Sequence, residues 1–147
     1  MTSKLADIRA GIAANLSTLK TTYRDMQILA YVPANPTLPA IWVKPTQGAV
    51  TEYHQAFETM GNPEGQFTWS LTVQAFAAGG LSESAQILLD ELLDVSGPHS
   101  VKAAIEADKT LGGASEGLIV RRCISYQEYQ RPDGTLALGA EWLVEVS

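Results

Sequence analysis

The most regular pattern along the chain is a strict alternation of apolar and polar residues between Phe67 and Ala75. Successive side chains of a strand point to opposite faces, so this run predicts a strand with one face in a core and one polar face. Shorter or less regular runs, bounded by prolines and glycines, predict five more strands. These are Gln27–Val32, Ala40–Pro45, Val50–Phe57, Leu118–Tyr126 and Leu136–Val146.

Three other segments place apolar residues three and four positions apart, which is typical of amphipathic helices. They are Ser3–Thr22, for which Ser3 is the candidate N-cap, a helix from an N-cap at Ser82 to about Val95, and a short helix at Val101–Ala107. The order is therefore one helix, four strands, two helices and two strands. It predicts a single α+β domain over residues 1–147, with a mainly antiparallel (mixed) sheet on which the N-terminal helix and two further helices pack.

Two predicted loops carry residues that favour hairpins. Gly61–Gly65 (GNPEG) precedes the alternating strand, and Gln130–Thr135 (QRPDGT) precedes the last one. Within that last strand, Gly139 suggests a β-bulge.

The composition limits the classes of function. The net charge is −6, which argues against binding nucleic acid, because such binding depends on Lys and Arg neutralising phosphates. We expect no direct, sequence-specific nucleic-acid contact. No run approaches about 18 apolar residues, so we expect a soluble protein without a membrane partner, made in a reducing compartment. The single cysteine, Cys123, is interpreted as a buried structural thiol.

The glycine-rich stretch Asp108–Gly117 (DKTLGGASEG) raises the question of a phosphate-binding loop. A Walker loop needs a Lys after its glycines, and a dinucleotide-binding loop needs a strand before it and a helix after it. Here the Lys precedes the glycines, the predicted helix comes before and the predicted strand after. We therefore interpret the stretch as a helix-to-strand connector whose glycines adopt positive φ.

The titratable residues form no recognisable catalytic or metal-binding pattern. His54 and His99 have no partner spacing that ties them to a nucleophile, and Asp90, Glu91 and Asp94 are most simply a solvated helix face. We expect no catalytic residue, no cofactor and no metal. The tryptophans and tyrosines of the strands are interpreted as core or interface residues.

The basic residues Arg121, Arg122 and Arg131 are the only local basic cluster, for which ion pairing with a neighbouring subunit is one interpretation.

The order of the elements resembles that of the tail terminator (tail completion, or neck) proteins of long-tailed bacteriophages. The most familiar part is the near-motif Ala-Asp-x-Thr-Leu-Gly-Gly at residues 107–113, which lies between a short helix and an amphipathic strand. The resemblance covers most of the chain by element order, and its near-motif part covers about Ser100 to Ile124.

That resemblance implies a structural protein of the virion and not an enzyme. Such proteins form a ring, commonly of six copies, at the head-proximal end of the tail, after assembly in the host cytoplasm. The ring caps the tube of tail tube protein, stops its polymerisation and offers a surface to the head–tail connector. Candidate interface residues are the basic and hairpin-loop positions Arg121, Arg122, Arg131, Asp133, Gly134, Asn62 and Glu64. One hypothesis is that one of the two hairpin loops reaches the tube.

Two alternatives stay open. One is another neck, head-completion or tail tube component, which assembles differently. The other is a small-ligand-binding domain or enzyme with its site on the open face of the sheet, for which a pocket with two or more converging ionisable groups would be the mark.

Overall fold

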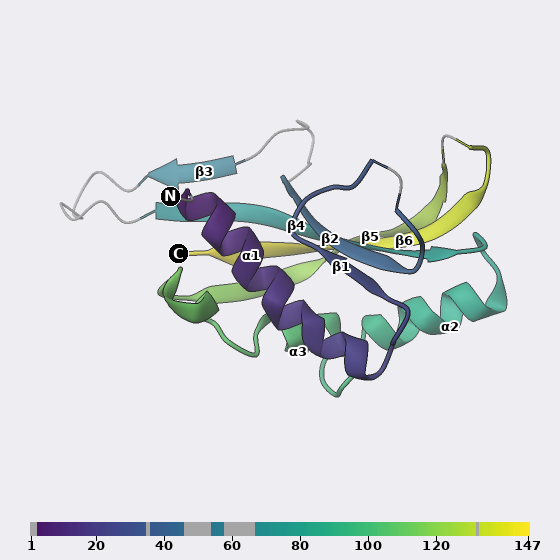
Figure 1. The fold of residues 1–147 in the computed structure, drawn as a ribbon, viewed down its shortest axis with the longest axis horizontal. Coiled ribbons are helices and arrows are strands. Elements are labelled where there is room, and N and C mark those ends of the chain that lie inside the picture. Colours follow the sequence, from purple (N-terminus) through teal and green to yellow (C-terminus); the bar gives the residue numbers. More distant parts are fainter. Residues whose placement is uncertain (1–2, 35, 46–53, 58–66, 132) are drawn as a thin grey trace.

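The computed structural model describes residues 3–34, 36–45, 54–57, 67–131 and 133–147 (Figure 1). Three α-helices and two 3₁₀ helices are present within these ranges: α1 (Lys4–Leu16), η1 (Ser17–Thr21), α2 (Glu83–Leu92), α3 (Val101–Ile105) and η2 (Leu111–Gly113). The strands are β1 (Gln27–Leu29), β2 (Ala40–Pro45), β3 (His54–Phe57), β4 (Phe67–Ala78), β5 (Leu118–Gln130) and β6 (Leu136–Val146). The predicted α+β fold is confirmed, with an N-terminal helix and two further α-helices.

The strands form one mixed sheet in the order β1-β2-β4-β6-β5. All of its pairs are antiparallel except β1 with β2, which are parallel. The long strand β4 is the centre: β6 pairs along one edge, while β2 and β3 follow one another along the other edge. β5 is the last strand in this order, and it pairs with β6.

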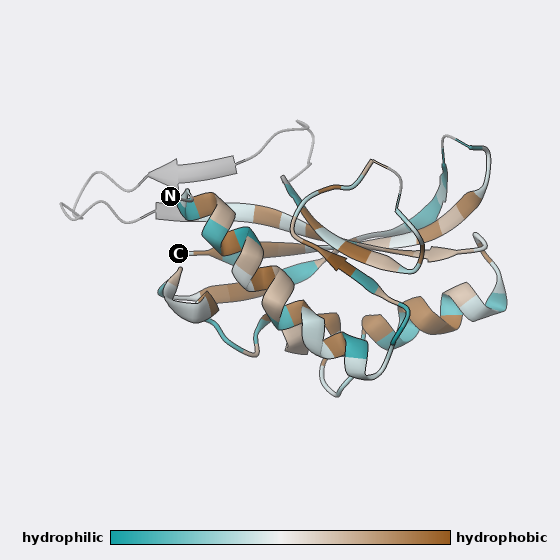
Figure 2. Cartoon of the chain, viewed as in Figure 1, coloured by the Kyte–Doolittle hydropathy of each residue, from teal (hydrophilic) through white to brown (hydrophobic). Residues whose placement is uncertain are grey.

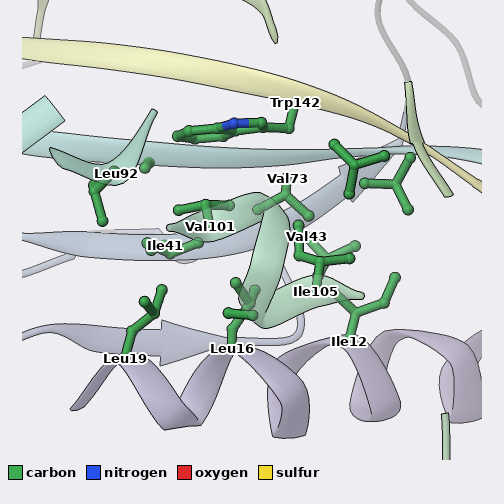
Figure 3. Packing of buried hydrophobic residues seen from close by; sticks show 14 of the residues in the cluster. Ile12, Leu16, Leu19, Ile41, Val43, Val73, Leu92, Val101, Ile105 and Trp142 are labelled. Carbon is green, nitrogen blue, oxygen red and sulfur yellow. The ribbon is translucent and has the colours of Figure 1, made fainter. Parts of the chain in front are cut away.

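The helices pack on one face of this sheet, and the hydrophobic core lies between the two layers (Figure 1). Ile12, Leu16 and Leu19 point from α1 and η1 toward Val43 and Val73 on the strands (Figure 3). Hydrophobic residues recur among hydrophilic ones along α1 and α2 (Figure 2). The buried ones stand three or four positions apart, as an amphipathic helix requires: Ile8, Ile12 and Leu16 in α1, and Ala85, Leu89 and Leu92 in α2. Burial of the apolar side chains is what holds the helices on the sheet.

Each α-helix begins at a serine whose hydroxyl accepts a hydrogen bond from the backbone N–H three residues later. Ser3 accepts from Ala6, Ser82 from Ala85, and Ser100 from Ala103. These bonds satisfy backbone donors that have no partner inside the helix. The N-caps predicted at Ser3 and Ser82 are therefore confirmed.

A buried arginine fastens α1 to the edge of the sheet. The Arg9 guanidinium donates hydrogen bonds to the carbonyl oxygens of Ala30 (3.1 Å) and Val43 (2.9 Å), and it lies 4.6 Å from the centre of the Tyr31 ring. It therefore links the helix to β2 and to the segment after β1.

Two sequence-based interpretations are wrong. Gly139 is not in a bulge, because it pairs regularly with Phe76 and Gln127; the irregularities lie in β5, between Val120 and Arg122 and between Cys123 and Ser125. Cys123 is exposed, because the edge strand carries it past the part of the sheet that the helices cover.

Candidate functional site

The Asp108–Gly117 stretch connects α3 to β5, as its residue order predicts. Gly112 and Gly113 have φ values of 68° and 99°, which suit glycine and strain other residues. The side-chain amide of Asn15 donates 2.9 Å hydrogen bonds to the carbonyl oxygens of Ile105 and Asp108, which ties the start of the connector to α1.

Two of the connector's backbone N–H groups are occupied by one of its own carboxylates, and others donate to backbone carbonyl oxygens. Asp108 accepts hydrogen bonds from the Thr110 hydroxyl (2.6 Å), the Thr110 N–H (3.1 Å) and the Gly112 N–H (3.0 Å). These bonds, led by that of the hydroxyl, hold the pKa of Asp108 below its usual value. A phosphate would meet a negative charge where it needs N–H donors, so the geometry favours a structural connector.

A polar network crosses the face of the sheet that points away from the helices, here called the second face. The Trp42 indole N–H donates to Gln74 Oε1 (2.8 Å), Gln74 Nε2 donates to Glu141 Oε2 (3.4 Å), and Lys44 Nζ lies 2.9 Å from the same Glu141 oxygen. The Lys44 and Glu141 side chains are only 6% and 11% exposed. The network therefore joins β2, β4 and β6 through a largely desolvated ion pair, whose removal from one side would leave a buried charge.

An apolar groove lies on the same face beside this network. The rings of Trp42 and Phe76 lie 5.0 Å apart, and those of Phe76 and Tyr129 lie 5.1 Å apart, edge to face. The groove holds a cavity of about 270 Å³, and its remaining wall comes from the Pro33–Leu38 segment and the β5–β6 hairpin. We call it the aromatic groove; the described residues that line it are Pro33, Ala34, Pro36, Leu38, Trp42, Phe76, Tyr129, Gln130, Arg131 and Ala137.

Arg131 is the charged residue among those that line the aromatic groove. Its Nη2 donates to the Pro36 carbonyl oxygen (2.8 Å), which joins the hairpin to the segment between β1 and β2. A groove with apolar walls and one cation can accept an apolar side chain or a small apolar ligand. Among its described lining residues the other ionisable group is the Tyr129 phenol, whose hydroxyl is hydrogen-bonded to Ser125 and Gln127.

The three arginines grouped together in the sequence are not brought together in space. Arg121 and Arg122 lie near the start of β5, and Arg131 follows its last residue, so about 30 Å of extended strand separates the two ends. Arg121 Nε and Nη2 each lie 2.9 Å from Glu145 Oε2. The interpretation of one basic cluster is therefore replaced by two separate positions.

The hairpin candidates have mixed outcomes. Asp133 accepts hydrogen bonds from the Thr135 hydroxyl (2.6 Å) and N–H (2.9 Å), and Gly134 has a φ of 89°. The Arg131 N–H donates to the Thr135 carbonyl oxygen (2.8 Å), so this turn is held together by its own backbone and side chains. Asn62 and Glu64 lie outside the described residues.

The acidic residues of α2 lie on its solvent side and contact neighbouring elements. Asp90 accepts a hydrogen bond from the Tyr126 hydroxyl (3.0 Å), and Glu91 accepts one from the Tyr23 hydroxyl (2.9 Å). The pKa of both tyrosines is raised, chiefly because burial disfavours the charged phenolate. The hydrogen bond and the negative charge of the neighbouring carboxylate add to this effect. Asp94 Oδ2 lies 2.7 Å from His99 Nε2. Within the described ranges, no three His, Cys, Asp or Glu side chains are grouped to hold a metal ion.

Sequence reasoning missed both the polar network and the aromatic groove. The residues of the network come from β2, β4 and β6, which are far apart in the chain and meet through their register. The groove also needs the pairing of β5 with β6, which brings Tyr129 beside Phe76. One signal was available for the network: Lys44 is the charged residue in the otherwise apolar run Ala40–Pro45.

A comparison of the chain with protein-family models finds no match, and a comparison with curated proteins finds no relative. In the part of the chain that the structure describes, no helix is both long and apolar enough to cross a membrane.

Proposed function

We propose that this chain is a structural protein of a bacteriophage tail, which forms a ring, with six copies as the expected number, on the end of the tail tube. The ring stops the polymerisation of the tube protein and presents a surface to the head–tail connector. The protein would then reside at the head-proximal end of the tail in the virion, and in the host cytoplasm during assembly.

The observation that carries the proposal is the order of the elements, on which the resemblance rests. A capped N-terminal helix leads into short strands, a long central strand and α2, and the Ala-Asp-x-Thr-Leu-Gly-Gly segment forms the turn between α3 and β5. The internal bonds of Asp108 and the contacts of Asn15 give that segment a structural task. A ring subunit also needs two different complementary patches, and the two arginines at the start of β5 lie far from the acidic side of α2 (Figure 1).

The test is electron microscopy of the purified protein, alone and with the tube protein of the same phage. The expected result is closed rings, and tubes of limited length that carry one ring at an end. Long tubes of the chain by itself would identify a tube subunit. Particles that bind the head connector and leave tube length unchanged would identify another neck or head-completion component.

The aromatic groove favours a second candidate, a domain that binds a small apolar ligand. This candidate predicts a large and specific rise in the melting temperature with one member of a library of small molecules. Replacing Phe76 by Ala, which opens the groove, should then abolish that rise. Rings that cap tubes without any added ligand would favour the structural proposal instead.

A further inference from the structure

The exposed side of α2 combines acidic and apolar residues. Glu83, Ile87 and Asp90 follow one another at spacings of four and three residues, which places them along one side of the helix. Asp94 follows just after the end of the helix. Ile87 is 52% exposed, a large fraction for an isoleucine on a helix whose other face is in the core. The sequence from residue 45 to residue 101 contains no Lys or Arg, so no basic residue of this helix balances its charge.

Exposed apolar side chains of the sheet continue this side of the molecule. Tyr126 of β5 is 39% exposed and its hydroxyl donates to Asp90. The Leu81 N–H donates to Glu128 Oε2 (3.0 Å), which places Leu81, 59% exposed, beside the same strand. We call this set the α2 surface; it comprises Leu81, Glu83, Ile87, Asp90, Asp94 and Tyr126.

A second surface has the opposite charge. Ile119, 43% exposed, lies beside Arg121 and Arg122 near the start of β5. Both arginines are exposed, and only one of them, Arg121, has an ion pair among the described residues. We call these three residues the β5 surface. They lie on β5, the last strand in the order of the sheet, and pairing with Glu145 and Leu143 of β6 places Ile119 and Arg122 on the second face.

The helix α2 and the start of β5 lie toward opposite ends of the longest axis of the molecule (Figure 1). Along β5 the two surfaces come nearest between Arg122 and Tyr126, which are four residues, or about 13 Å, apart. Each has an exposed isoleucine. The charges beside Ile87 are acidic, whereas beside Ile119 the carboxylate of Glu145 is paired with Arg121, so that Arg122 gives the β5 surface its net positive charge. A patch that is complementary to a different patch on an identical chain makes a heterologous contact, which continues from copy to copy until the ring closes.

We propose that the α2 surface of one copy docks on the β5 surface of the next, with Ile87 packed against Ile119 and the carboxylates of Glu83 and Asp90 facing Arg121 and Arg122. This contact rests on the proposed ring and names the surfaces that build it. The opposite charges set the orientation of the two copies and accelerate their encounter, while the two isoleucines supply the apolar centre.

Cross-linking between the two isoleucines allows a direct test. The native thiol is removed, because the register of Cys123 with the core residue Trp142 places it on the opposite face of β5 from Arg122. One protein carries Ile87→Cys together with Cys123→Ser, and the other carries Ile119→Cys together with Cys123→Ser. The two carry different mass tags and are treated with a short bismaleimide, both at high concentration and on assembled rings. The expected result is a mixed covalent dimer that forms in the mixture and not in either protein alone.

The matched control is Ala10→Cys with Cys123→Ser, since Ala10 is exposed on α1 and belongs to neither surface. Mixed dimers in no greater yield than with this control would overturn the proposal, as would equal cross-linking within the separate proteins. A chain with Ile87→Cys, Ile119→Cys and Cys123→Ser carries one thiol on each surface. It should give a ladder of products that ends at the size of the ring.

Charge reversal supplies a second measurement on the same cross-link. Arg122→Glu should lower the yield of mixed dimers by about tenfold, because it sets like charges against each other. Arg24→Glu, at an exposed position that belongs to neither surface, should leave the yield unchanged. Equal yields for the two variants would refute the charge pairing. Rings on tubes without the cross-link would refute this contact alone, whereas the cross-link in a protein that caps no tube would refute the proposed function alone.

Discussion

Gly139 is the residue at which the second face of the sheet has no room for a side chain. A Cβ atom there would collide with Phe76 Cε1, would come 2.6 Å from Phe76 Cδ1 and would come 2.9 Å from Tyr129 Cε2. The missing side chain thus lets two aromatic rings lie across β6 and form the wall of the aromatic groove.

Gly139→Ala should therefore displace both rings and lower the free energy of unfolding by about 1–3 kcal/mol, the usual cost of overpacking. Urea denaturation measures this loss. Gly117→Ala is the control, since a Cβ there would meet only Ser147 Oγ at 3.4 Å. Equal denaturation midpoints for the two variants would show that the rings move aside at no cost.

Thr72 carries a buried hydroxyl that has no hydrogen-bond partner among the described residues. Thr72→Val keeps the shape of the side chain and removes the unsatisfied group, so we expect the free energy of unfolding to rise by about 1 kcal/mol. Thr72→Ser, which keeps the hydroxyl and loses a methyl group, should lower it. Loss of stability in the valine variant would mean that the hydroxyl has a partner in solution.

Asp108 makes the stability of the connector depend on pH. Its folded pKa lies below the ordinary value of 3.8, so its contribution to stability is complete above that pH and is lost as the pH falls through the lowered folded pKa. Thr110→Val removes the hydroxyl donor and should raise the pKa of Asp108 toward 3.8, as an NMR titration of the carboxyl group measures. Thr135→Val, which acts on Asp133 instead, should leave the pKa of Asp108 unchanged.

At the scale of the elements, the sequence was most informative where a pattern is local. The β2 run Ala40–Pro45 was predicted with its observed bounds. The N-cap of α1 at Ser3 followed from the type of residue there and from the apolar spacing after it. The predicted end of β5 at Tyr126 was short of the observed Gln130, because its last residues are held by pairing with β6 rather than by alternation of their own. The bulges of β5 and the exposure of Cys123 depend on that same pairing, so no local pattern could reveal them.

The N-caps of the α-helices contribute different amounts to stability, although each N-cap is a serine. Ser100 is fully buried, and besides accepting from Ala103 its hydroxyl donates to the Asp94 carbonyl oxygen at 2.5 Å. Ser100→Ala should lower the free energy of unfolding by about 2 kcal/mol, because it removes a cap and takes the hydroxyl away from the Ala103 N–H and the Asp94 carbonyl oxygen, which are part-buried.

Ser3→Ala is the matched variant, because Ser3 is exposed and the capping bond from Ala6 is the hydrogen bond that its hydroxyl makes. We expect a loss of about 1 kcal/mol or less. Chemical denaturation of the two proteins side by side measures the difference. A larger loss for Ser3→Ala would contradict the view that burial of the second hydrogen bond decides the cost.

At the scale of the whole molecule, charge is distributed in a way that no single element reveals. Five of the basic residues precede residue 45, five follow residue 101, and the segment between them has only acidic charges. The fold places part of that acidic segment, α2, at one end and the start of β5 toward the other (Figure 1). The candidate residues Arg121 and Arg122 were found from sequence, whereas their acidic counterpart required the exposed side of α2 to be known.

The turn between β5 and β6 is the candidate contact with the tail tube in the assembled protein. It projects beyond the paired residues Gln130 and Leu136, and it is closed by the bond from the Arg131 N–H to Thr135. If this turn reaches the tail tube, replacing residues 131–135 by Asn-Gly should leave rings intact, because Asn-Gly closes a two-residue hairpin. The variant should then fail to limit tube length, which electron microscopy of tubes grown in its presence measures.

Arg131→Ala is the control for that experiment, because it removes the contact with Pro36 and keeps the length of the turn. Rings that bind tubes and stop their growth in this control, but not in the shortened protein, would assign capping to the reach of the turn. Tubes of normal length with the shortened protein would place the tube contact elsewhere. Loss of the rings themselves would mean that the turn belongs to the contact between copies, and the tube-reaching interpretation would again be wrong.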